Sequence, residues 1–151
     1  MLYNQFVNKG VFIGTMVIDE NNALDLQTSI DRQEFISMGD LVYGCVNKDT
    51  DEKLLKIGKT SSSEGFYRRA YTYRRSTDKT TAMMVNKMRE LNITELEVYA
   101  VPIPKLVKQT FDSFLEENTS IEISIAETKE KEYQAIALDQ GYSLPLCTSK
   151  K

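Results

Sequence analysis

The chain has 151 residues, 41% of them hydrophobic, and its 19 basic and 22 acidic side chains give a net charge of −3. This length and composition fit a single globular domain, over residues 1–151, with a buried core. No stretch approaches the run of about 20 apolar residues that crosses a bilayer, so we expect no membrane partner. The N-terminus, Met1 to Gln5, lacks the charged and apolar blocks of a signal peptide.

The sequence contains no histidine and only two cysteines, Cys45 and Cys147. Two thiols far apart in the sequence, without histidine, argue against a zinc site. Free thiols suit a reducing compartment, which predicts a cytoplasmic protein. A disulfide between the two cysteines is the alternative.

Residues 1–40 are predicted to form an N-terminal β-element. The run from Val11 to Ile18 is rich in β-branched and apolar residues, and a polar turn separates it from a second extended run over 23–28. Residues 30–38 are ambiguous, with Asp31 a candidate cap for a short helix.

A second hairpin is predicted next. In the run 40–47, Leu, Tyr and Cys at odd positions alternate with Val, Gly and Val at even positions, as in a strand. A polar loop, 47–52, leads to the partner strand over 53–58, which is followed by Lys59 and Thr60.

A helix is predicted over 65–75, after an N-cap signal in the run Ser61 to Glu64. Phe66, Ala70 and Tyr73 have helical spacing and should face the sheet.

Positive charge is concentrated in this hairpin and helix. Residues 53–79 contain eight basic and two acidic side chains, a net charge of +6, whereas the remainder has 11 basic and 20 acidic side chains, or −9. Such a segment can present a cationic face to phosphates. Arg69 borders the packed face of the helix, and three arginines lie outside it: Arg68, Arg74 and Arg75. A merely solvated arginine-rich helix is the alternative.

The remaining elements complete an α+β layer architecture. A methionine-rich helix is expected over 80–91 and a third strand of the sheet over 96–101. Residues 105–118 are predicted to be a helical or loop insertion. Ser124 to Glu127 has the form of a capping box for a last helix that reaches Leu138 or Asp139. The segment after that helix is expected to pack back on the core.

This order of parts resembles the GIY-YIG nucleases, and within them most the endonuclease II branch of the T-even phages. The resemblance runs from about Val11 to Leu146. It rests on matched pieces in the same order: Leu41-Val42-Tyr43, Lys56-Ile57-Gly58-Lys59-Thr60, Arg69 with Tyr73, Tyr73-Arg74, Asp78-Lys79-Thr80, and Glu132 with Ile136. It implies a small central antiparallel or mixed sheet flanked by helices, a catalytic core over 41–146 and an N-terminal β-hairpin extension.

The activity that the resemblance implies is metal-dependent cleavage of DNA, most simply double-stranded DNA, by nicking or double-strand cutting. A single such site cuts one strand, so double-strand cutting would need a homo-oligomer or successive nicks. If the protein is encoded by a phage, its compartment is the host-cell cytoplasm.

Roles follow residue by residue from this resemblance. Tyr43 is expected to be the general base, with nearby Lys and Arg lowering the pKa of its phenol; plain packing is the alternative. Lys56 stands where many relatives have a second Tyr, and it would contact phosphate or favour the Tyr43 phenolate. Arg69 would clamp the scissile phosphate with its planar fork, with Tyr73 four residues later.

Further contacts to the DNA backbone are expected from the end of the second hairpin and from the helix. Gly58 would let the backbone approach a phosphate, while Lys59 and Thr60 supply a charge and a donor. The other DNA-binding candidates are the exposed arginines of the helix: Arg68, Arg74 and Arg75.

The metal, Mg²⁺ or Mn²⁺, needs hard oxygen ligands and often takes only one or two carboxylates. Glu132 precedes Ala135 and Ile136 by three and four residues, so it is expected on a core-facing stripe, where a carboxylate requires a partner or an ion. We therefore predict Glu132 as the ligand and Glu130 as the second candidate, with Glu127 engaged in the capping box.

The sequence departs from the family pattern in three places. Leu41 replaces the Gly of the first motif, Lys56 replaces a Tyr, and Leu146-Cys147-Thr148 stands near the expected place of a terminal Asn. These departures keep two alternatives open. One is a related fold that binds nucleic acid without cutting it, and the other is a protein-interaction or inhibitor module whose acidic surface contacts a basic partner.

Overall fold

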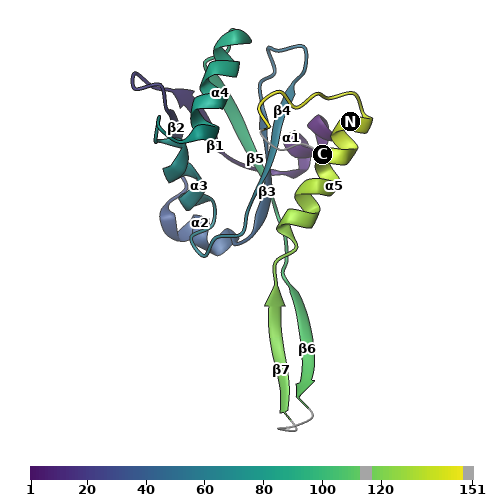
Figure 1. Cartoon of the computed structure of the whole chain (residues 1–151). Helices are drawn as coiled ribbons and strands as arrows, with labels where there is room; N and C mark the ends of the chain where they lie inside the picture. The colour runs from purple at the N-terminus through teal and green to yellow at the C-terminus, as the bar shows by residue number, and fades with distance from the viewer. Residues whose placement is uncertain (113–116, 148–151) are drawn as a thin grey trace.

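The computed structural model describes residues 1–112 and 117–147 and shows an α+β fold (Figure 1). Five strands form one antiparallel sheet in the order β2-β1-β5-β3-β4. They are β1 (Val11–Ile18), β2 (Leu24–Gln27), β3 (Leu41–Val46), β4 (Leu54–Thr60) and β5 (Glu95–Pro102). The predicted fold class and the N-terminal hairpin are confirmed. Because β1 also pairs with β5, this hairpin continues the central sheet.

Helices cover both faces of the sheet, so the molecule has three layers. They are α1 (Leu2–Lys9), α2 (Arg32–Met38), α3 (Phe66–Tyr73), α4 (Lys79–Glu90) and α5 (Ala126–Asp139). Residues of α2, α3 and α4 pack in one core, and residues of α1 and α5 pack in the other. The predicted β-element over 1–40 is present as the β1–β2 hairpin, but α1, which was not predicted, precedes it. The ambiguous run over 30–38 forms α2, and the candidate cap Asp31 is its N-cap residue. In α2 the side chains of Asp31 and Glu34 form a capping box.

Strand β3 lies between β5 and β4, and all six of its residues are buried. Leu41, Tyr43 and Cys45 pack in the first core, whereas Val42 and Val46 pack in the second. The predicted alternation of side chains between the two faces of this strand is thus correct. Both faces are covered by helices. A helix layer on each side of the sheet accounts for the apolar character of both sets of positions.

The helix over 65–75 is confirmed as α3, with Phe66 and Tyr73 buried and Ala70 partly buried against the same core. Its N-cap differs from the prediction. Gly65, at a φ of +61°, is the N-cap residue, and no side chain caps the helix. A positive φ of this kind favours glycine. The serines before it form a turn in which the Ser62 hydroxyl accepts a hydrogen bond from the Glu64 N–H at 3.1 Å.

Two strands, β6 (Leu106–Asp112) and β7 (Glu117–Ile123), form a separate antiparallel hairpin that projects from the core (Figure 1). The expectation of a helical or loop insertion over 105–118 was therefore wrong for the residues described, while 113–116 lie outside the described part. This hairpin pairs only with itself, so it forms a two-stranded unit apart from the five-stranded sheet.

The C-terminal segment packs back as predicted and covers the free edge of β4. The Leu146 N–H donates to the Leu55 carbonyl at 3.0 Å, and the Ile57 N–H donates to the Cys147 sulfur at 3.5 Å. These bonds satisfy backbone groups that an edge strand would otherwise expose. The Glu52 carboxylate, in the loop between β3 and β4, anchors the same segment by accepting from the Leu144 N–H at 2.7 Å.

Both cysteines are buried and unpaired, which confirms the predicted free thiols. Burial raises the pKa of the Cys45 thiol to about 12, with Lys56 opposing the shift. Among the described residues, no helix is long and apolar enough to cross a membrane.

Phe66 is the aromatic side chain that joins α3 to the sheet. It is fully buried, and its ring lies 5.0 Å from that of Tyr43 and 5.9 Å from that of Phe35. Replacing it with alanine leaves a cavity, and we predict a loss of about 3–5 kcal/mol in the free energy of unfolding. Phe12, which is 50% exposed, is the matched control, and Phe12→Ala should cost less than about 1 kcal/mol. Urea unfolding measures both, and equal losses would contradict this packing.

Candidate active site

A polar cavity of about 270 Å³ lies at the free edge of β4, where helices from both layers reach the sheet edge. It collects side chains from strands β3 and β4, from α3 and α4 on one face of the sheet, from α5 on the other face, and from the C-terminal segment. Its lining consists of Tyr43, Lys56, Ile57, Gly58, Lys59, Arg69, Tyr73, Thr80, Glu127, Glu130, Gln134 and Cys147. Six of the predicted site residues therefore meet here: Tyr43, Lys56, Gly58, Lys59, Arg69 and Tyr73.

Tyr43 reaches this cavity by lying across β4. It is paired with Gly58 in the β3–β4 ladder, and a Cβ atom at position 58 would overlap the end of its phenol ring. Gly58 was predicted to let the backbone approach a phosphate. The structure shows a different requirement, namely that the absence of a side chain at this position opens the path for Tyr43.

The hydroxyls of Tyr43 and Tyr73 are hydrogen bonded at 2.6 Å, and both side chains are fully buried. Burial raises the pKa of each phenol, because a phenolate there loses its solvation; for Tyr43, Arg69 opposes the shift. Arg69 acts to lower the pKa of Tyr43, as predicted, but burial outweighs it, so the net direction that we predicted was wrong. Desolvation outweighs the one nearby guanidinium, and both phenols are neutral at physiological pH.

Arg69 is the cation that acts to lower the pKa of both Tyr43 and Tyr73. It projects from α3 and is partly buried at the cavity. Burial opposes its charge, but the neighbouring Tyr43, Tyr73 and acidic groups outweigh this and raise the pKa of its guanidinium. Lys56 from β4 is 6% exposed and borders the same cavity. A permanently charged planar fork and a buried ammonium are suited to binding an oxyanion.

Glu130 is the carboxylate of α5 that faces this cluster. Burial raises its pKa, while Lys56, Lys59 and Arg69 act in the opposite direction. Glu127, one turn earlier, also borders the cavity, but its carboxylate pairs with Lys131 at 3.4 Å and is 66% exposed. The predicted capping box is absent: α5 begins after Ile125, which makes no side-chain cap.

Glu132, the predicted metal ligand, does not reach the cavity lining described above. Its side chain is 54% exposed and pairs with Lys129 at 3.1 Å. The prediction that Glu132 and Ile136 lie on the core-facing side of the helix was wrong, because Ile136 is 43% exposed. The buried side carries Ala137 instead. The structure therefore favours Glu130, the second candidate, as the carboxylate in a position to hold a cation.

Gln134 is a site residue that the sequence analysis missed. It is 3% exposed, and its amide donates to the Ile57 carbonyl at 3.1 Å, which ties α5 to the edge of β4. Glu130, Gln134 and Ala137 follow helical spacing, so one stripe carries them all to the sheet edge. Helical spacing from the buried Ala126 could have revealed this face, but a polar residue and two alanines give little hydrophobic signal.

The remaining predicted DNA contacts are dispersed. Thr60 is buried, and its hydroxyl donates to the Gly65 carbonyl at 3.2 Å. Arg74 pairs with Asp25 at 3.7 Å, on the side of α3 away from Arg69, and Arg75 is exposed beyond the end of the helix. Arg68 is exposed and borders a neighbouring cavity with Lys59 and Arg69.

Comparisons with known proteins support the fold. No protein-family model matches the chain. No curated protein matches it at the level of sequence. A solved structure of a mutant of bacteriophage T4 EndoII superposes with a TM-score of 0.53 at 15% identity, over 90% of this chain and 92% of that one. Restriction endonuclease HPY188I in complex with product DNA superposes with a TM-score of 0.54 at 15% identity, over 93% and 78% of the two chains. The chain thus has a nuclease fold related to that of EndoII, a GIY-YIG nuclease, which confirms the predicted resemblance.

The buried tyrosine pair predicts how stability depends on alkaline pH. In the unfolded chain a tyrosine ionises near pH 10, whereas Tyr43 and Tyr73 hold their protons to higher pH when folded. The folded state then binds more protons, so the free energy of unfolding falls above about pH 10, by up to about 1.4 kcal/mol per pH unit for each phenol.

Urea unfolding between pH 8 and 11 measures this slope. The double variant Tyr43→Phe/Tyr73→Phe should lose the contribution of the pair, whereas Tyr71→Phe, at a 50% exposed position, should keep the wild-type slope. Equal slopes for wild type and the double variant would show that the pair ionises as freely in the folded protein as in the unfolded chain.

Proposed function

We propose that this protein is a metal-dependent endonuclease that hydrolyses phosphodiester bonds of DNA. The observation that carries the proposal is the meeting of Tyr43, Tyr73, Arg69 and Glu130 in one cavity at the edge of β4. The structural likeness to EndoII and to HPY188I, the latter in complex with product DNA, supports the choice of reaction and substrate.

The scissile phosphate binds among the cations of the cavity. Lys56, Lys59 and Arg69 outnumber the carboxylates of Glu127 and Glu130 in its lining, so the cavity attracts an anion. Arg69 can offer two parallel N–H donors to the non-bridging oxygens, and a phosphate bound in this way would lie in the cavity that Tyr43 and Tyr73 also line. Such fixed positive groups favour the extra negative charge of the pentavalent transition state.

The donors of the cavity fit Mg²⁺ or Mn²⁺. Among the described residues there is no cluster of three or more His, Cys, Asp or Glu, so a multi-carboxylate cage is not formed there. A half-buried Glu130 can nevertheless supply one hard oxygen, which is sufficient for an ion that keeps several waters and binds the substrate phosphate. When bound, the ion would stabilise charge on the phosphate and make a coordinated water more acidic.

Tyr43 is proposed as the proton acceptor for the attacking water. Its Oη is held by the hydroxyl of Tyr73, which can donate to a phenolate there, and the guanidinium of Arg69 offsets the negative charge. Because burial disfavours this phenolate, the role of Tyr43 depends on added positive charge in the cavity. We therefore expect that Tyr43 contributes to cleavage only when a cation is bound at Glu130.

Cleavage of supercoiled plasmid with Mg²⁺ tests the proposal. Wild-type protein should yield nicked or linear DNA only when metal is present. Glu130→Gln should lower the cleavage rate by about 100-fold or more, because loss of a group that merely supports a metal ligand already costs 10–100-fold. Glu132→Gln is the matched control on the same helix and should cleave at nearly the wild-type rate, since Glu132 is exposed and paired with Lys129.

Tyr43→Phe in the same assay separates catalysis from binding. It should bind plasmid as wild type does and cleave it slowly. Plasmid that stays intact with wild-type protein, at concentrations that shift its mobility, would instead favour the nucleic-acid-binding module, and equal losses in the two glutamate variants would refute the assignment of Glu130.

A further inference from the structure

A second polar cavity, of about 340 Å³, adjoins the first between the end of β4 and α3. Its lining consists of Lys59, Thr60, Ser61, Ser62, Arg68, Arg69 and Thr72. Lys59 and Arg69 line both cavities, so the two cavities are neighbours that share these two cations. The second cavity lies on the side away from Glu130, since no residue of α5 contributes to it.

The chemistry of this lining suits an oxyanion. It combines three cationic side chains with four hydroxyl-bearing residues and contains no carboxylate. The Lys59 ammonium donates to the Ser61 hydroxyl at 3.3 Å. Within the described part of the chain neither Lys59 nor Arg68 forms an ion pair within 4 Å.

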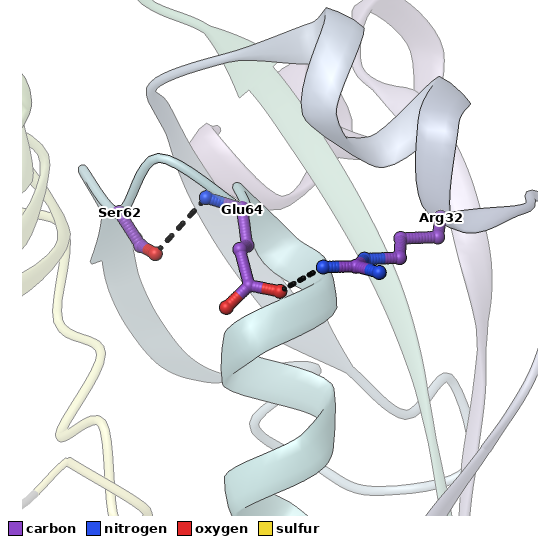
Figure 2. A network of polar contacts seen from close by, with 3 residues as sticks. All are labelled: Arg32, Ser62 and Glu64. Carbon is purple, nitrogen blue, oxygen red and sulfur yellow. Dashed lines mark hydrogen bonds and ion pairs between the residues drawn. The ribbon is translucent and has the colours of Figure 1, made fainter.

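The one acidic residue of the loop is held out of the cavity. Figure 2 shows the Glu64 carboxylate extending to Arg32 of α2, which it binds at 2.8 Å, while the Glu64 N–H donates to Ser62 at 3.1 Å. Glu64 therefore has a cation partner on the other side of the loop and does not line the cavity. This arrangement leaves the cations on the cavity side available to a negatively charged ligand.

Arg68 is the cation that belongs to the second cavity alone. It is exposed, and its guanidinium lies over the ring of Tyr71 at 5.8 Å from the centroid. A cation–π contact with a ring restrains a guanidinium and leaves its N–H groups able to bind an anion.

We propose that this second cavity binds the phosphate next to the scissile one on the same DNA strand. The assignment rests on the proposed function for the position of the scissile phosphate, because Lys59 and Arg69 join the two cavities. Two linked phosphate sites make the substrate a strand with at least two consecutive phosphates. We therefore expect the enzyme to prefer phosphodiesters inside a strand, where a charged phosphate next to the scissile one can occupy the second cavity.

Binding measured without cleavage tests the subsite first. We would measure the affinity for a 20-base-pair duplex in EDTA over a range of salt concentrations, using a length of about two helical turns. Arg68→Gln should reduce the slope of log K against log salt by about 1, the value for one lost phosphate contact. Arg68→Lys, which keeps the charge, should restore the slope, and Arg89→Gln, at an exposed residue that bonds to Asn22, should leave it unchanged.

Cleavage then locates the phosphate. On a duplex whose cut site has been mapped, Arg68→Gln should raise KM about tenfold and change kcat less than about twofold, as expected for a group that binds substrate and transition state equally. A neutral methylphosphonate placed next to the cut phosphate should raise the KM of the wild type by a similar factor on one side of the cut and not on the other. It should have little further effect on the KM of Arg68→Gln.

The outcomes separate the two proposals. An unchanged salt slope, or independent effects of the methylphosphonate and of Arg68→Gln, would overturn the subsite while leaving the endonuclease proposal standing. A reduced slope that Arg68→Lys restores, in a protein that cleaves no DNA, would support a phosphate site here and overturn the endonuclease proposal. Because Arg68 is exposed, we expect each variant to unfold at the wild-type temperature, which thermal unfolding checks.

Discussion

The close approach of Tyr43 to Gly58 is the contact on which the candidate site depends. A tyrosine on an inner strand of a sheet ordinarily points into a helix layer, far from solvent. Here the residue beside it on the edge strand has no side chain, so the ring extends across β4 and its hydroxyl reaches Tyr73. Phe66 packs edge-on against the same ring at 5.0 Å and limits its movement. A rigid phenol is thereby held at the sheet edge without a loop to position it.

The edge position also explains how two separate helix layers contribute to one cavity. Helix α3 lies on one face of the sheet and α5 on the other, and only around the free edge of β4 can Arg69 and Glu130 approach each other. Such an edge is a hazard if its backbone groups are exposed. Gln134 and the C-terminal segment bind those groups at Ile57, so the backbone of the edge is satisfied at the wall of the cavity.

Part of this arrangement could be predicted from the sequence, because burial of one face of a strand or helix leaves a periodic pattern of apolar residues. The alternation over 40–47 and the spacing of Phe66 and Tyr73 predicted the strand and the buried face of α3, and the resemblance added the sheet flanked by helices. The face of α5 could not be found in the same way, since its buried residues are alanines and a glutamine rather than large apolar groups. The pKa of Tyr43 depends on burial, which is a property of the assembled layers, so counting nearby cations gave the wrong direction. The hairpin of β6 and β7 pairs with no strand of the central sheet, so the strands predicted for that sheet gave no indication of it.

The central claim is that Glu130, beside the tyrosine pair, holds the divalent cation of a DNA-cutting site. Anomalous diffraction at the manganese edge, from crystals grown with Mn²⁺ and a DNA duplex, tests it most directly. The account predicts one strong peak next to the carboxylate of Glu130, with a DNA phosphate in contact with both the peak and Arg69. A peak at Glu132 on the exposed face of α5, or DNA bound elsewhere with no metal near Glu130, would contradict it.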